Sequence, residues 1–208
     1  DETIKIYRKA VKYITDVALF RFDEISVIDA YEGYTKQQAQ RKYVESLIHA
    51  TKESPACYER FDMEFYKFPS YLRREAITTA IGIVSSYKTN LQKWEANGKK
   101  GRRPHLNRNQ NVMPCFYRNN TFLDSEETNI VSLKLYNGKD WIWETSVIRD
   151  CDFMYAYSHM KEWKASAPVL VKRNHRYELR ISYEMANSKF SKFKKDKEVE
   201  TVIGVDLG

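Results

Sequence analysis

A single acidic residue ends an apolar stretch at the C-terminal end of the sequence. The stretch runs from Val199 to Gly208, and its β-branched and aliphatic residues are typical of a buried strand. A carboxylate at the tip of such a strand is costly to bury unless it is hydrogen-bonded, ion-paired or bound to a metal. Asp206 is therefore a candidate ligand for a divalent cation, and the alternative is an ordinary acidic residue at a turn.

Basic residues are concentrated in two short connecting stretches. Residues 97–118 contain six basic side chains and no acidic one, and residues 186–198 add five lysines against two acids. This clustering is typical of a polyanion site, because a lysine-rich loop can follow a phosphate backbone while an aromatic neighbour stacks on a base. A merely solvated loop is the alternative. The candidate nucleic-acid contacts are Lys99, Lys100, Arg102, Arg103, Arg108, Tyr117, Arg118, Lys192, Lys194 and Lys195.

The other reactive residue types do not form a recognisable site. Cys57, Cys115 and Cys151 are odd in number and form no Cys-x-x-Cys pair, so we expect reduced thiols. None of the four His residues has a partner at metal-ligand spacing. No apolar run approaches the roughly 20 residues that span a bilayer, and no N-terminal signal is visible. We expect no membrane contact and a cytoplasmic, nucleoid-associated protein.

Apolar residues recur at three- and four-residue steps through the first half of the chain, which predicts a helical bundle. The first helix is expected over residues 1–22. Thr35 and Gln38 have the spacing of a capping box and should begin the second. A short aromatic helix is predicted over 56–68. The longest helix should begin at Pro69-Ser70, with Ser70 as its N-cap, and end at Asn97-Gly98. Its apolar stripe is expected to run from Leu72 to Trp94.

From residue 112 onward the pattern changes to strands. Residues 112–118 predict one aromatic strand, and Asn137-Gly138 joins two more, over 130–136 and 141–148, as a hairpin. A second hairpin is expected from residues 169–172 and 176–185, with Tyr177 on the buried face of its return strand. Five or six antiparallel strands indicate a small barrel or a curled sheet.

In this order, the features of the chain resemble those of the TnpB family of transposon-encoded RNA-guided nucleases, relatives of the type V CRISPR effectors. The matching features are the long helix from Pro69-Ser70, the basic loop over 98–104 that leads to an aromatic strand, and the paired hairpins. The segment 177–184, shortly before Ile203-Gly-Val-Asp-Leu-Gly208, completes the match. The resemblance spans most of the chain.

The resemblance implies an α+β fold in three parts. Residues 1–97 would form a recognition-like helical bundle, residues 98–198 an antiparallel β-barrel of the wedge, oligonucleotide-binding type, and residues 199–208 the first strand of an RNase H-like RuvC nuclease domain. Asp206 would be a catalytic, metal-binding carboxylate, and Mg²⁺ the cofactor of the complete DNA endonuclease. Guide RNA and target DNA would be the partners. The family's first barrel strand should precede residue 1, so we expect a fragment shortened at both ends.

Two-metal phosphodiester cleavage requires several carboxylates, and Asp206 alone cannot supply them. We therefore expect the chain to bind nucleic acid without cutting it and without holding Mg²⁺ stably. Three alternatives remain open: a transposase DNA-binding module that uses no guide RNA, an actin-like nucleotide-binding enzyme with Gly204 and Gly208 near phosphate, and a structural role for Asp206.

Overall fold

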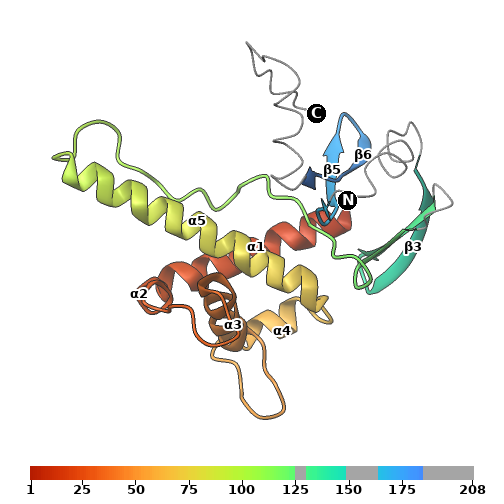
Figure 1. Ribbon diagram of the computed structural model, residues 1–208, viewed down its shortest axis with the longest axis horizontal. Coiled ribbons are helices and arrows are strands. Elements are labelled where there is room, and N and C mark those ends of the chain that lie inside the picture. Colours follow the sequence, from red (N-terminus) through yellow and green to blue (C-terminus); the bar gives the residue numbers. More distant parts are fainter. Residues whose placement is uncertain (125–129, 149–163, 185–208) are drawn as a thin grey trace, which may run out of the picture.

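The computed structural model of the protein describes residues 1–124, 130–148 and 164–184. Helices come first and antiparallel strands follow, so the predicted α+β order is confirmed (Figure 1). The helices are α1 (Glu2–Phe20), α2 (Phe22–Ser26), α3 (Lys36–Ile48), α4 (Arg60–Glu64) and α5 (Ser70–Ala96). The strands are β1 (Phe122–Asp124), β2 (Ile130–Tyr136), β3 (Trp141–Val147), β4 (Lys164–Ala165), β5 (Val169–Arg173), β6 (Arg176–Arg180) and β7 (Tyr183–Glu184).

The helix boundaries follow the expected signals with two corrections. The capping box of α3 is confirmed, because the Gln38 N–H donates to Thr35 Oγ1 at 3.3 Å and the Thr35 N–H donates to Gln38 Oε1 at 2.9 Å. The first predicted helix is divided in two at Arg21. Pro69, rather than Ser70, occupies the N-cap position of α5, and no side-chain bond caps this end.

The aromatic segment 56–68 is helical only over α4. Its phenylalanines nevertheless have the expected core role, because Phe61, Phe65 and Phe68 are buried and their rings lie 4.8–6.1 Å apart. The Phe68 ring also meets the Trp141 ring edge-on at 5.2 Å. These rings therefore join the helices to the first sheet.

The strands form three separate sheets within the described ranges, ordered β1-β2-β3, β4-β7 and β5-β6, and these do not close into a barrel there. Both predicted hairpins are present: Tyr136 pairs with Trp141 across residues 137–140, and Arg173 pairs with Arg176. Positive φ at Asn174 and His175, 46° and 66°, identifies a turn whose twist matches the flanking strands.

Two strand predictions need correction. Residues 112–118 form only isolated bridges, Cys115 with Val169 and Arg118 with Phe122. The predicted return strand breaks after Arg180. Tyr177, expected to be buried, is exposed, and its hydroxyl donates to Asp1.

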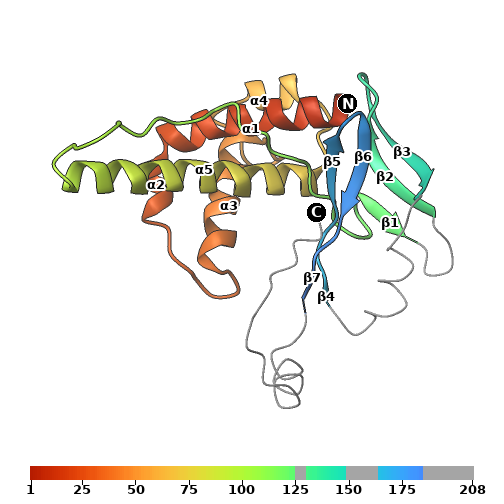
Figure 2. The same cartoon turned by 90° about the horizontal axis from the view of Figure 1, so that it is seen from above.

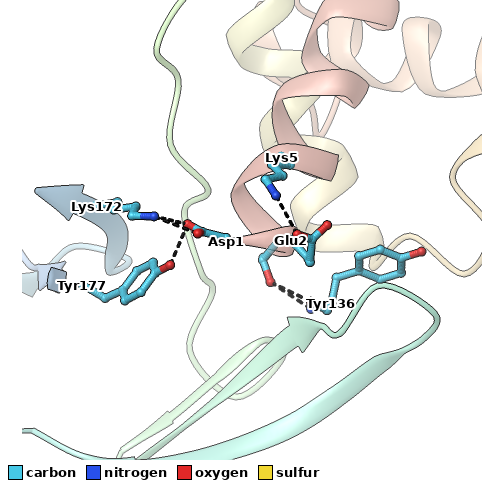
Figure 3. Close-up of polar contacts among 7 residues, drawn as sticks. Asp1, Glu2, Lys5, Tyr136, Lys172 and Tyr177 are labelled. Atoms are coloured by element: carbon cyan, nitrogen blue, oxygen red, sulfur yellow. Dashed lines mark hydrogen bonds and ion pairs between the residues drawn. The ribbon is translucent and has the colours of Figure 1, made fainter. Parts of the chain in front are cut away.

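The helices and the first sheet share one hydrophobic core, which extends from α1 and α5 to Phe116, Phe122, Val131 and Leu133. Polar contacts at the start of α1 connect it to the hairpin β5-β6 and to β2 (Figure 3). Lys172 Nζ and the Tyr177 hydroxyl both lie 2.6 Å from Asp1 Oδ1. The buried Thr3 hydroxyl accepts the Tyr136 N–H at 2.9 Å.

Candidate nucleic-acid interface

The basic residues predicted to contact nucleic acid lie mostly on one continuous segment, residues 98–112, which we call the strap. The strap leaves the C-terminal end of α5 and runs back along α1 and α5 toward the strands (Figure 2). It contains no helix or strand. Its position therefore depends on individual contacts with the two helices.

The strap begins with a well-defined helix cap. The Lys99 N–H donates to the Trp94 carbonyl at 2.9 Å, and the Gly98 N–H donates to the Glu95 carbonyl at 3.0 Å. These two bonds form a Schellman motif, which requires a left-handed residue after the helix. Gly98 meets that requirement with a φ of 65°, so the chain reverses at the residue that the sequence predicts.

Contacts at three further places fasten the strap, near Trp94, Asp16 and Arg8. The Trp94 indole Nε1–H donates to the Gly101 carbonyl at 3.2 Å, and the Arg103 guanidinium lies 5.9 Å from the centre of the same ring. Arg108 Nε pairs with Asp16 Oδ1 at 2.5 Å. Nearer the strands, Arg8 Nε donates to the Val112 carbonyl at 3.0 Å, and Arg8 also bonds to Asn111. The strap is thus held at both ends and near its middle.

These contacts leave four cations on the surface of the strap. Lys99, Lys100, Arg102 and Arg103 are all exposed. Within the described ranges none of them forms an ion pair, and Arg103 contacts only an aromatic face. Because each charge lacks a carboxylate partner, the field of the four adds up at the end of α5.

The end of α5 carries this charge away from the core. Val84 is the last buried residue of the helix, although the apolar pattern predicted a stripe as far as Trp94. The remaining 12 residues to Ala96 correspond to about 18 Å of helix. Figure 1 shows this end of α5 projecting beyond the other helices. The cations therefore lie where a long, charged partner can reach them from several directions.

The other predicted contacts have partners inside the protein. Arg108 pairs with Asp16, as described, and Arg118 pairs with Asp124 while lying 5.3 Å from the Phe122 ring centre. The Tyr117 hydroxyl donates to Glu75 Oε2 at 3.3 Å. Burial, and then the neighbouring Glu75 carboxylate, raise the pKa of Tyr117. The structure brings Tyr117 and Arg118 into the junction between α5 and the sheet, away from the tip of the strap.

The remaining predicted residues, Lys192, Lys194, Lys195 and Asp206, lie outside the described residues. Within residues 1–124, 130–148 and 164–184, no group of three or more His, Cys, Asp or Glu residues is arranged to hold a metal ion. No helix of that same portion is long and apolar enough to cross a membrane.

Two residues that are not among the predicted contacts position the strap. The apolar pattern places Trp94 in the stripe of the long helix, but its indole binds the strap instead. Arg8 lies in the first helix without any local signal of such a role, and it bonds to three consecutive residues at the end of the strap, Asn111, Val112 and Met113. The signal that could have suggested the role of Trp94 is its place in the last turn of a helix, just before a glycine-containing loop.

Residues 1–137 match the model of the Aq_aa04 family, a range that extends from the start of α1 through β2 and includes the whole strap. No curated protein and no solved structure matches the chain.

Proposed function

The chain belongs to the Aq_aa04 family, and we propose that it binds nucleic acid through the exposed cations of the strap. The observation that carries the proposal is the group Lys99, Lys100, Arg102 and Arg103, which is exposed at the end of α5 and forms no ion pair with any residue that the structure describes. Lysine and arginine side chains neutralise backbone phosphates and release counterions, which provides affinity without sequence preference.

The order of elements supports a more specific proposal. Helices, a basic segment and paired antiparallel hairpins occur in the order expected for a TnpB-like RNA-guided DNA endonuclease. In this proposal the strands belong to a barrel of the wedge type, and Asp206 belongs to the first strand of a RuvC-like domain that binds Mg²⁺ in the complete nuclease. The chain would bind guide RNA and the guide–target duplex, since proteins of this kind read backbone and shape while base pairing reads sequence.

The test is a titration of the 208-residue chain with a structured RNA and with a duplex DNA of matched length, each at two salt concentrations. We expect tighter binding to the RNA, with a steep dependence on salt. Replacing Lys99, Lys100, Arg102 and Arg103 by Glu should weaken binding by about tenfold or more. The same change should reduce the salt slope by about one unit for each phosphate that the variant no longer neutralises.

A matched control carries the same change of net charge elsewhere. Lys9, Lys36, Lys52 and Arg60 are exposed and lie in the helical part, outside the strap, and their replacement by Glu should leave most of the affinity. Equal losses in the two quadruple variants would mean that only net charge matters and would refute a strap site. Preference for the duplex over the RNA would favour a transposase DNA-binding module that uses no guide.

A further inference from the structure

The solvent side of the sheet β1-β2-β3 carries exposed apolar and aromatic side chains among its polar ones. Phe122, Val131 and Leu133 face the core, so the residues that alternate with them face away from it. An antiparallel sheet with one solvated side normally carries polar residues there, and exposed apolar groups gathered together mark an interaction site. We call the open part of this side the outer face; its members include Leu123, Ser132, Lys134, Trp143, Thr145 and Val147. It ends at Trp141, which Phe68 covers.

A tryptophan and a lysine lie side by side on the outer face. Lys134 and Trp143 are directly opposite each other in the pairing of β2 with β3, and Lys134 Nζ lies 5.6 Å from the centre of the Trp143 ring. Trp143 keeps 43% of its surface exposed, because β3 is at the edge of its sheet. An exposed aromatic ring with a cation over one face suits a planar group that carries negative charge.

The next pair on the same face offers hydrogen-bonding groups. Ser132 lies opposite Thr145, and their hydroxyl oxygens are 2.9 Å apart. This pair is two residues from Lys134 and Trp143, or about 7 Å along the strands. A chain lying along β2 and β3 would therefore meet a stacking surface and a cation first, and two hydroxyls next.

The charge of the outer face favours an anionic partner. Lys134 is the only charged side chain on this face within the described residues of β1, β2 and β3. Glu144 lies opposite Leu133 and so points to the other side of the sheet, and Asp124 on that side is paired with Arg118. Asp140, just before β3, is the nearby acid, and its carboxylate is paired with Lys67 Nζ at 3.3 Å. A backbone hydrogen bond, and after it the cations Lys67 and Lys134, lower the pKa of Asp140.

We propose that the outer face binds a single-stranded segment of nucleic acid, with one base stacked on Trp143 and a phosphate near Lys134. One hydroxyl of the Ser132–Thr145 pair would donate a hydrogen bond to the following nucleotide, because the other O–H is used between the two residues. The inference rests on the proposed nucleic-acid binding and adds to the strap a second, stacking surface. Stacking on an aromatic ring tolerates any base, so this surface selects single strands rather than a sequence.

The two surfaces lie at opposite ends of the helical layer. Figure 2 shows β2 and β3 beside the N-terminal end of α1, whereas the strap turns at the far end of α5. The 27 residues of α5 span about 40 Å. A partner that touches both surfaces is therefore an extended polymer, and each surface can be tested separately.

The experiment compares the complete chain with its Trp143→Ala, Trp143→Phe and Phe20→Ala variants. The probe is a labelled single-stranded oligouridine of about 12 nucleotides, within the range of site sizes known for single-strand binders. We expect Trp143→Ala to weaken binding by about five- to tenfold with an unchanged salt slope, because stacking releases no counterions. Trp143→Phe keeps an aromatic ring and should bind within about threefold of the original chain.

Phe20→Ala is the matched control, since Phe20 is an aromatic residue with 79% exposure at the far end of α1. It should bind as the original chain does. Quenching of tryptophan fluorescence by the oligonucleotide gives a second readout. It should be present in the original chain and reduced in Trp143→Phe, and it does not require that the Trp143→Ala variant fold correctly.

The failures of the two proposals are distinguishable. If the original chain binds the oligonucleotide and Trp143→Ala binds equally well, the stacking surface is refuted while binding through the strap stands. If the original chain binds no nucleic acid, both are refuted. If Trp143→Ala abolishes self-association in sedimentation and leaves oligonucleotide binding intact, the outer face joins copies of the chain and the inference is also wrong.

Discussion

Arg73 is a cation held inside the helical bundle, with 8% of its surface exposed. Its Nε and Nη2 atoms both donate to Glu45 Oε1, at 3.1 and 2.9 Å, and so connect α5 to α3. Arg74 approaches the other oxygen of Glu45 at 3.5 Å. The sequence places these arginines on the same helix without revealing that one is buried, because the partner lies 28 residues earlier in the chain.

Removing Glu45 should therefore destabilise the bundle strongly. Glu45→Ala leaves Arg73 buried and unpaired, which typically costs about 3 kcal/mol of unfolding free energy. Glu64→Ala is the control, because its partner Arg60 is 77% exposed, and exposed pairs contribute less than about 1 kcal/mol. Urea denaturation measures both values. Equal small losses would contradict a structural role for the Glu45–Arg73 pair, and Glu45→Leu combined with Arg73→Met should recover much of the loss.

At the scale of elements, the glycine inside α5 and the glycine that caps it have opposite effects on stability. Gly98 follows the helix with a φ of 65°, a conformation that other residues adopt only with strain. Gly82 lies within the helix, is exposed, and has no heavy atom within 4 Å of the position that a Cβ would occupy. The first glycine stabilises the turn into the strap, whereas the second weakens the helix.

Alanine at these two positions should change stability in opposite directions. Gly98→Ala should lower the unfolding free energy by about 1 kcal/mol, because the Schellman turn then requires a strained residue. Gly82→Ala should raise it by about 0.5–1 kcal/mol through helix propensity alone. Thermal unfolding of the two variants checks both signs. A stabilising Gly98→Ala would mean that the cap is not formed in solution.

Local signals predicted the elements whose ends depend on a few adjacent residues. Thr35 with Gln38, Asn97 with Gly98, and Asn137 with Gly138 each mark a cap or turn that the structure contains, because the bonds involved connect residues at most five positions apart. The basic cluster at 99–103 was predicted in the same way, and its exposure agrees with the charge pattern.

Features set by distant contacts were not predictable from the same signals. The apolar pattern of α5 continues past Val84, but within the described part of the chain no later side chain of the helix is buried. Tyr117 and Arg118 resembled nucleic-acid contacts in the sequence, yet each has an acidic partner, and Glu75 lies 42 residues away. Trp143 became a candidate only once the pairing with β2 placed Lys134 opposite it.

At the scale of the whole molecule, the helices and the sheet β1-β2-β3 depend on the same core. The resemblance implies a boundary at residues 97 and 98, and the buried cluster includes residues on both sides of it, from α1 and α5 to Phe116 and Phe122. Phe68 lies at the centre of this connection, with its ring 5.2 Å from that of Trp141 and close to those of Phe61 and Phe65. A core shared in this way should make the two parts unfold together.

Phe68→Ala tests this coupling, because it removes a 5% exposed ring from the junction between the start of α5 and β3. We expect a loss of about 3–5 kcal/mol, the usual cost of truncating a buried phenylalanine. Helix content from circular dichroism and tryptophan fluorescence should lose their signals at one lowered urea midpoint, since both report on structures built on the same core. Phe20→Ala, which removes an exposed ring from the end of α1, should leave that midpoint nearly unchanged. Two separated transitions in Phe68→Ala, with fluorescence lost first, would show instead that the helical bundle stands alone and that the sheet docks onto it as a separate unit.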